Sequence, residues 1–90
     1  MPVIHLRIEG RVQGVGFRWF VRAEARPLGV TGWVQNRDDG AVVGELEGRE
    51  DALDALEEVL ELGPPSAIVT NVEITEISDD LPQFNRFEIR

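Results

Sequence analysis

One glycine-rich stretch constrains this chain more than any other feature: residues 10–18, which read GRVQGVGFR. The stretch follows a run that predicts a strand and precedes a run that predicts a helix. Glycine lets the backbone approach a ligand closely and adopt positive φ, and a helix start offers unpaired N–H groups at the positive end of its dipole. Arg18 adds a planar guanidinium that suits two phosphate oxygens. The stretch therefore predicts a β–α loop that binds phosphate or carboxylate.

The loop matches neither of the two common nucleotide-binding motifs. A P-loop needs GxxxxGK[ST], and the chain contains no lysine. A dinucleotide fingerprint needs a third glycine where this chain has Trp19. A small phosphorylated or carboxylated ligand is therefore favoured over ATP, GTP or NAD, and a tight turn without a ligand is the alternative.

The composition indicates one small domain over residues 1–90. The chain has no cysteine, which excludes a disulfide framework, a zinc–thiolate site and a cysteine nucleophile. It has neither an apolar run of the ~20 residues that span a bilayer nor a basic-then-apolar leader pattern. The net charge of −8 disfavours nucleic acid and anionic membranes as partners. We expect a cytoplasmic protein with no nucleic-acid or membrane partner.

The hydrophobic periodicity predicts two helices and five strands. The strands are expected at residues 3–9, 30–36, 41–47, 71–77 and around Phe87 and Ile89, and the helices at 17–26 and 50–62. Pro27 should disturb or end the last turn of the first helix, and Gly29 is a natural stop. The resulting order, βαββαβ with a terminal edge strand, predicts an α+β ferredoxin-like sandwich, with two helices packed on one face of an antiparallel sheet.

A second motif lies further along the chain, GWVQN at residues 32–36 followed by GAV at residues 40–42. Together the two motifs resemble the acylphosphatase family, whose pattern is a GxVQGVGFR loop and a GWVxNxxxGxV strand and turn. The resemblance extends to GPPSA at residues 63–67 and to the closing FEIR at residues 87–90. It therefore covers nearly the whole chain.

The resemblance implies a small, monomeric, metal-independent hydrolase that cleaves small acyl phosphates into a carboxylate and inorganic phosphate. It implies that Arg18 binds the phosphoryl group and that Asn36 positions the attacking water. The backbone N–H groups implied to hold the phosphoryl oxygens are those of Gln13, Gly14, Val15, Gly16 and Phe17. No cofactor or metal is expected, because the chain has one histidine, no cysteine and scattered acidic residues.

Other interpretations of these residues remain open. The same loop could belong to a non-catalytic phosphate- or anion-binding module of the same fold. Asn36 could simply start the hairpin turn, and Arg18 could be a surface side chain. His5 is expected to be solvated. Arg37, directly after Asn36, adds a cation that the resemblance does not explain.

Overall fold

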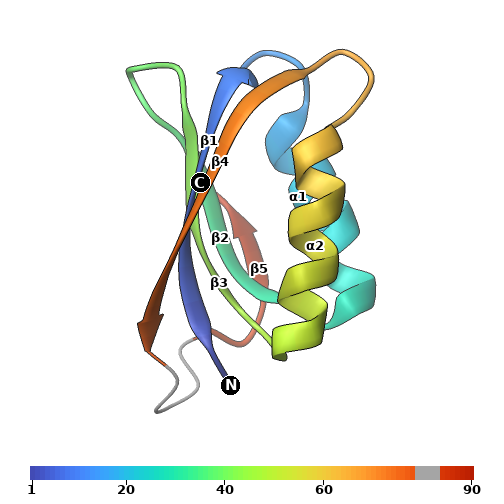
Figure 1. The fold of residues 1–90 in the computed structure, drawn as a ribbon, viewed down its shortest axis with the longest axis vertical. Coiled ribbons are helices and arrows are strands. Elements are labelled where there is room, and N and C mark those ends of the chain that lie inside the picture. Colours follow the sequence, from blue (N-terminus) through green and yellow to red (C-terminus); the bar gives the residue numbers. More distant parts are fainter. Residues whose placement is uncertain (79–83) are drawn as a thin grey trace.

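The computed structural model describes residues 1–78 and 84–90, and Figure 1 shows two helices on one side of a sheet. The strands are β1 (Val3–Arg11), β2 (Thr31–Asn36), β3 (Val42–Glu47), β4 (Ile68–Ser78) and β5 (Phe87–Ile89). The helical elements are α1 (Phe17–Ala25), a short 3₁₀ turn η1 (Arg26–Leu28), and α2 (Glu50–Leu62). This is the element order that the sequence predicts.

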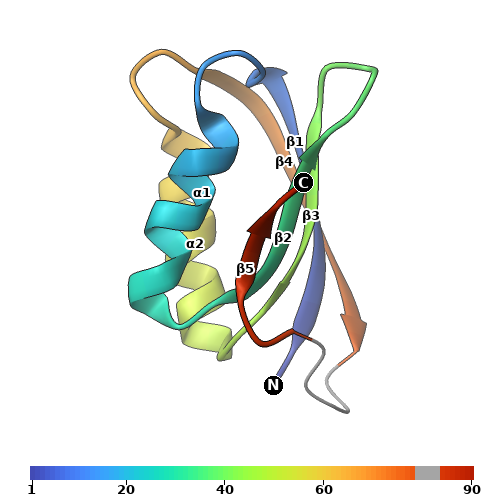
Figure 2. The ribbon, with the colours of Figure 1, turned by 180° about the vertical axis from the view of Figure 1, so that it is seen from behind.

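The strands lie in the order β4-β1-β3-β2-β5. β1 pairs antiparallel with both β3 and β4, and β2 pairs antiparallel with β3. β5 instead runs parallel to β2 (Figure 2), so the sheet is mixed, whereas a wholly antiparallel sheet was expected. The predicted ferredoxin-like α+β class, with both helices on one face, is confirmed.

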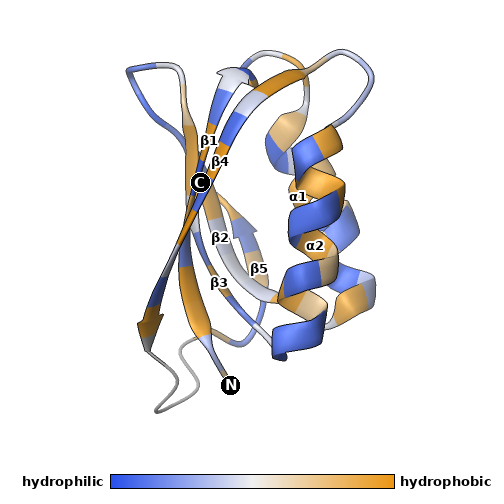
Figure 3. Cartoon of the chain, viewed as in Figure 1, coloured by the Kyte–Doolittle hydropathy of each residue, from blue (hydrophilic) through white to orange (hydrophobic). Residues whose placement is uncertain are grey.

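Each helix buries one stripe of apolar residues against the sheet, as an amphipathic helix does. The buried residues are Phe17, Val21 and Ala25 on α1, and Ala52, Leu53, Leu56 and Leu60 on α2. Hydrophobic and hydrophilic residues accordingly alternate along both helices in Figure 3. On the sheet side, β1 contributes Ile4, Leu6 and Ile8 to the same core. The helices are thus fixed on the sheet by apolar burial, which holds the loops at their ends in place.

The element boundaries differ from the prediction mainly at β1 and β4. These strands continue to Arg11 and begin at Ile68, because they pair with each other over these extra residues, after a register shift. At the end of α1, Pro27 lies in the 3₁₀ turn and Gly29 caps it with a left-handed φ of 72°. The predicted stop of the first helix is therefore confirmed.

Three connections lie together at one end of the molecule in both Figure 1 and Figure 2. They are the β1–α1 loop, the β2–β3 turn and the α2–β4 connection. The antiparallel β1–β3–β2 order brings the end of β2 to the same end of the sheet as the loop that follows β1. Within the described ranges, the structure contains no helix that is long and apolar enough to span a membrane.

Candidate active site

The glycine-rich loop between β1 and α1 has alternating backbone conformations. Gly14 and Gly16 have φ of 74° and 75°, whereas no described residue other than glycine has a positive φ. At both positions an added Cβ would meet no atom within 4 Å. Glycine is therefore favoured here by the positive φ, and not by a lack of space for a side chain. A chain of alternating φ signs turns successive N–H groups toward one concave side, a known anion-binding arrangement.

The backbone N–H groups of this loop are not used in hydrogen bonds within the described part of the protein. Among the described residues, no hydrogen bond has the backbone N–H of Gln13, Gly14, Val15 or Gly16 as its donor. Gly16 is also the N-cap of α1, whose first N–H groups have no partner within the helix. The loop and helix start therefore offer a row of donors to an anion.

A hollow of about 170 Å³ lies at this loop. It is lined by Val12, Gly14, Gly16, Phe17, Arg18, Trp19 and Asn36. The structure thus brings together Arg18 and Asn36, the two side chains singled out in the sequence. Gln13 and Val15 were expected to bind phosphate through their N–H groups, but they are not among the residues that line the hollow. Val15 packs against the core.

Arg18 lies in the first turn of α1, on the wall of the hollow. Its Nη1 donates a hydrogen bond of 2.8 Å to the backbone carbonyl oxygen of Arg90. A guanidinium carries five N–H donors, so this bond fixes the side chain and leaves most donors for a ligand. The contact with Arg90 joins the last described residue to the site, and no pattern in the sequence predicted it.

Asn36 ends β2 and is paired in register with Val42 of β3. Its Oδ1 is buried and has no hydrogen-bond partner among the described residues. An unsatisfied buried acceptor costs about 1–3 kcal/mol, and such groups in proteins call for a bound water or ligand. Asn36 is also among the residues that line the hollow, so its side chain is a candidate for binding a water molecule there.

The loop is held from two sides by side chains. Gln13 Nε2 donates to the backbone carbonyl oxygens of Arg37 and Ala41, at 2.6 and 3.0 Å, which ties the loop to the β2–β3 turn. Ser66, in the α2–β4 connection, donates from Oγ to the carbonyl oxygen of Val15 at 3.4 Å. The sequence predicted a role only for the backbone N–H of Gln13, and no local pattern indicates these side-chain hydrogen bonds.

An ion pair ties the β2–β3 turn to β1. Arg7 Nη2 lies 2.7 Å from Asp39 Oδ2, and Asp39 Oδ1 accepts a 3.1 Å hydrogen bond from the N–H of Ala41. The Arg7 guanidinium, and then the Ala41 N–H, hold the pKa of the Asp39 carboxyl below its usual value. The turn after Asn36 is therefore held by both β1 and the glycine-rich loop.

His5, Arg37 and the neighbouring Arg22 are not among the residues that line the hollow. His5 is partly exposed, and Arg37 is exposed and lines a separate shallow hollow over the β2–β3 turn. Arg22 lies over the Trp19 ring, with its Cζ 4.2 Å from the ring centroid. The described residues contain no group of three or more His, Cys, Asp or Glu side chains that could hold a metal ion.

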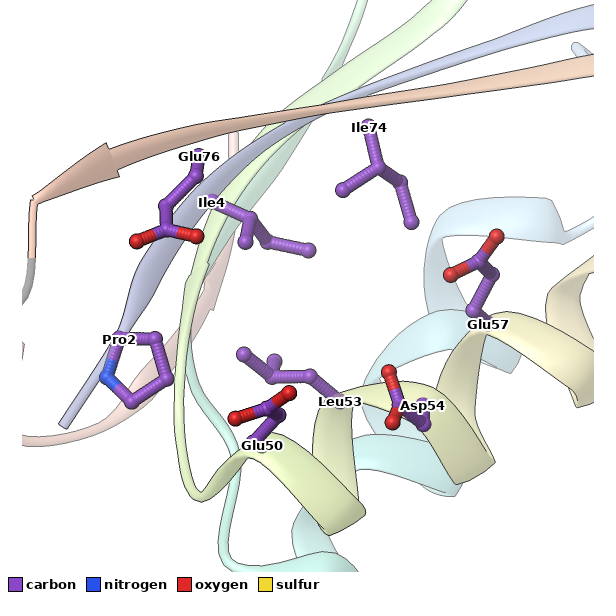
Figure 4. A pocket seen from close by; sticks show the side chains of 8 residues that line it. All are labelled: Pro2, Ile4, Glu50, Leu53, Asp54, Glu57, Ile74 and Glu76. Carbon is purple, nitrogen blue, oxygen red and sulfur yellow. The ribbon is translucent and has the colours of Figure 1, made fainter.

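A larger hollow of about 400 Å³ lies between α2 and strands β1 and β4 (Figure 4). Its lining residues are Pro2, Ile4, Glu50, Leu53, Asp54, Glu57, Ile74 and Glu76. Burial raises the pKa of Glu57, and the nearby charges of Glu61 and Asp54 raise it further. Four carboxyl groups make this hollow unsuitable for a phosphorylated ligand, so the smaller hollow at the glycine-rich loop is the candidate active site.

Comparison with known proteins identifies the family of the chain. The acylphosphatase family model matches residues 4–89, and the chain belongs to this family. It is 45% identical over 86 residues to an acylphosphatase of Thiobacillus denitrificans, covering 96% of this chain and 97% of the relative.

Solved structures give the same result for the fold. The crystal structure of acylphosphatase from Bacillus subtilis superposes with a TM-score of 0.94 at 44% identity, covering 100% of this chain and 99% of that chain. The crystal structure of T. kodakarensis HypF superposes with a TM-score of 0.86 at 33% identity, but the match covers 12% of that longer chain. The fold thus occurs both alone and within a larger protein.

Proposed function

We propose that this protein is an acylphosphatase, which hydrolyses the carboxyl–phosphate bond of small acyl phosphates to a carboxylate and inorganic phosphate. The observation that carries the proposal is one hollow that is lined by the glycine-rich loop, Arg18 and Asn36, where the Oδ1 of Asn36 has no hydrogen-bond partner among the described residues. Membership of the acylphosphatase family supports the choice of substrate.

In this proposal, the glycine-rich loop and Arg18 hold the phosphoryl group. The N–H groups of the loop and of the α1 start bind its oxygens, and the guanidinium spreads positive charge over them. Phosphoryl transfer depends mainly on positioning and on stabilising the charge of the transition state. Preorganised donors do both without a metal ion, because they are already oriented before the reaction.

Asn36 orients the attacking water. Its Oδ1 accepts a hydrogen bond from the water, whose oxygen attacks phosphorus while the bond from phosphorus to the acyl oxygen breaks. The electron pair of that bond leaves with the carboxylate, and the water proton goes to a phosphoryl oxygen. Because a carboxylate is a stable leaving group, the step needs no strong general acid. Asn36 orients the water and does not deprotonate it, because an asparagine cannot act as a base near neutral pH.

The biological setting is part of the same proposal. We expect residues 1–90 to act as one catalytic domain, as a monomer in the cytoplasm, with a small-molecule substrate and without a cofactor. Support for the stand-alone form comes from the Thiobacillus denitrificans relative, which this chain covers almost end to end.

The test is phosphate release from acetyl phosphate in the presence of EDTA, followed by addition of magnesium. We expect turnover that survives EDTA and does not rise several-fold with magnesium, and we expect inorganic phosphate to compete with the substrate. Strict magnesium dependence would contradict charge stabilisation by backbone and arginine. Phosphate binding without turnover would instead support the non-catalytic module.

A further inference from the structure

We propose that Trp19 forms the wall of an acyl-group subsite, so that this protein favours acyl phosphates whose acyl group is aromatic. The inference rests on the proposed function and deepens it by naming the substrate class. It concerns only the part of the substrate beyond the phosphoryl group.

Trp19 is an exposed apolar side chain at the edge of the candidate active site. It lines the hollow together with Arg18 and Asn36, yet 58% of its surface is exposed. Among the described lining residues, the other large apolar side chains, Val12 and Phe17, are 1% and 2% exposed and belong to the core. Core packing therefore does not explain a tryptophan at this position.

The Trp19 ring is held in place from one side. Arg22 lies one helical turn further along α1, where side chains three apart are neighbours, and its guanidinium lies 4.2 Å from the ring centroid. Such a cation–π contact restrains an otherwise free side chain. A ring that is already ordered loses less entropy when a second ring packs against it.

The direction of the reaction places the acyl group away from Asn36. Attacking and leaving oxygens lie roughly in line through phosphorus, so a water held by Asn36 requires the acyl oxygen to leave on the opposite side. A hollow of about 170 Å³ that holds the phosphoryl group leaves little room for a ring as well. The acyl group must therefore extend out of the hollow, and among the lining residues Trp19 offers exposed apolar surface to it.

The experiment compares kcat/KM for benzoyl phosphate and for acetyl phosphate, which share the reacting bond and differ in the acyl group. In Trp19→Ala, the benzoyl-to-acetyl ratio should fall about five- to tenfold, the size expected for one lost aromatic contact. Inhibition by inorganic phosphate should stay at the wild-type level, because phosphate lacks an acyl group. Trp19→Phe should restore most of the ratio.

Leu62→Ala is the matched control, because Leu62 is 82% exposed at the end of α2 and does not line the hollow. Its selectivity ratio should equal that of the wild type. An unchanged ratio in Trp19→Ala, with activity retained, overturns the acyl-group subsite alone. A wild-type protein that hydrolyses neither substrate overturns the proposed function and this inference with it.

Discussion

The side chain of Gln13 reaches the turn beyond Asn36 and donates a 2.6 Å hydrogen bond to the backbone carbonyl oxygen of Arg37. A second bond of 3.0 Å goes to the carbonyl oxygen of Ala41, at the other end of the same turn. One amide group thereby connects the glycine-rich loop, which is proposed to hold phosphate, with the strand end that carries Asn36. We expect this connection to help fix the distance between the two proposed functional groups.

Replacing Gln13 should loosen that connection. Gln13→Leu removes both hydrogen bonds at similar side-chain size, and each such bond contributes about 0.5–1.5 kcal/mol. We expect the free energy of unfolding to fall by about 1–3 kcal/mol, measured by urea denaturation. In steady-state kinetics, kcat should fall more than phosphate affinity, because the loop keeps its N–H groups while Asn36 shifts.

Gln35→Leu is the control for this change. Gln35 is exposed on β2, and its side chain makes no hydrogen bond to another described residue. The control should retain wild-type stability and kcat. A Gln13→Leu protein that also retained both would show that the connection has no effect on the site.

The glycine-rich loop allows a paired test of conformation and binding. Gly16 and Gly29 have φ of 75° and 72°, and at both an added Cβ would have open space. A left-handed conformation costs other residues about 1–2 kcal/mol, so Gly16→Ala and Gly29→Ala should lose similar stability in urea. Only Gly16→Ala should weaken phosphate binding in a titration. Equal phosphate affinities in the two variants would argue against the loop as the binding site.

The ion pair between Arg7 and Asp39 predicts a pH dependence of stability. The pKa of Asp39 is lowered in the folded protein, so its contribution is fully present above the unfolded value of about 3.9. The contribution is lost as the pH falls through the still lower folded value. Asp39→Asn should therefore be less stable than the wild type near neutral pH.

The difference between the two proteins should shrink as the pH falls below the unfolded value of about 3.9. Because the pair is largely exposed, the difference should also shrink in high salt. Urea midpoints of both proteins under these conditions provide the measurement. A difference that stayed constant with pH would rule out the carboxylate charge as its cause.

The local pattern of apolar and polar residues was sufficient to predict the type and bounds of an element where that element is long and amphipathic. The leucine stripe and the following prolines predicted the helix at residues 50–62, and α2 has these bounds. The direction of β5 was not predictable in this way, because a strand of three residues carries no pattern that fixes its partner. The early start of β4 at Ile68 depends on pairing with the end of β1, which is a long-range interaction.

Some features of the candidate site were likewise predictable from the sequence, and others were not. The glycine spacing indicated positive φ in the loop, and the resemblance implied that Arg18 and Asn36 meet, as they do at the hollow. The hydrogen bonds of Gln13 to the turn and of Arg18 to Arg90 join residues far apart in sequence. Such contacts depend on the assembled fold, and no local sequence pattern predicts them.

The most direct test of the account compares Arg18→Gln with Asn36→Ala by phosphate titration and steady-state kinetics, with circular dichroism as the check of folding. Arg18 is proposed to hold the phosphoryl group throughout, so Arg18→Gln should weaken phosphate binding and lower kcat. Asn36 is proposed to contact mainly the water, so Asn36→Ala should lower kcat by roughly 10²–10³ while phosphate affinity stays near the wild-type value. A folded Asn36→Ala protein with near-full activity would contradict the account.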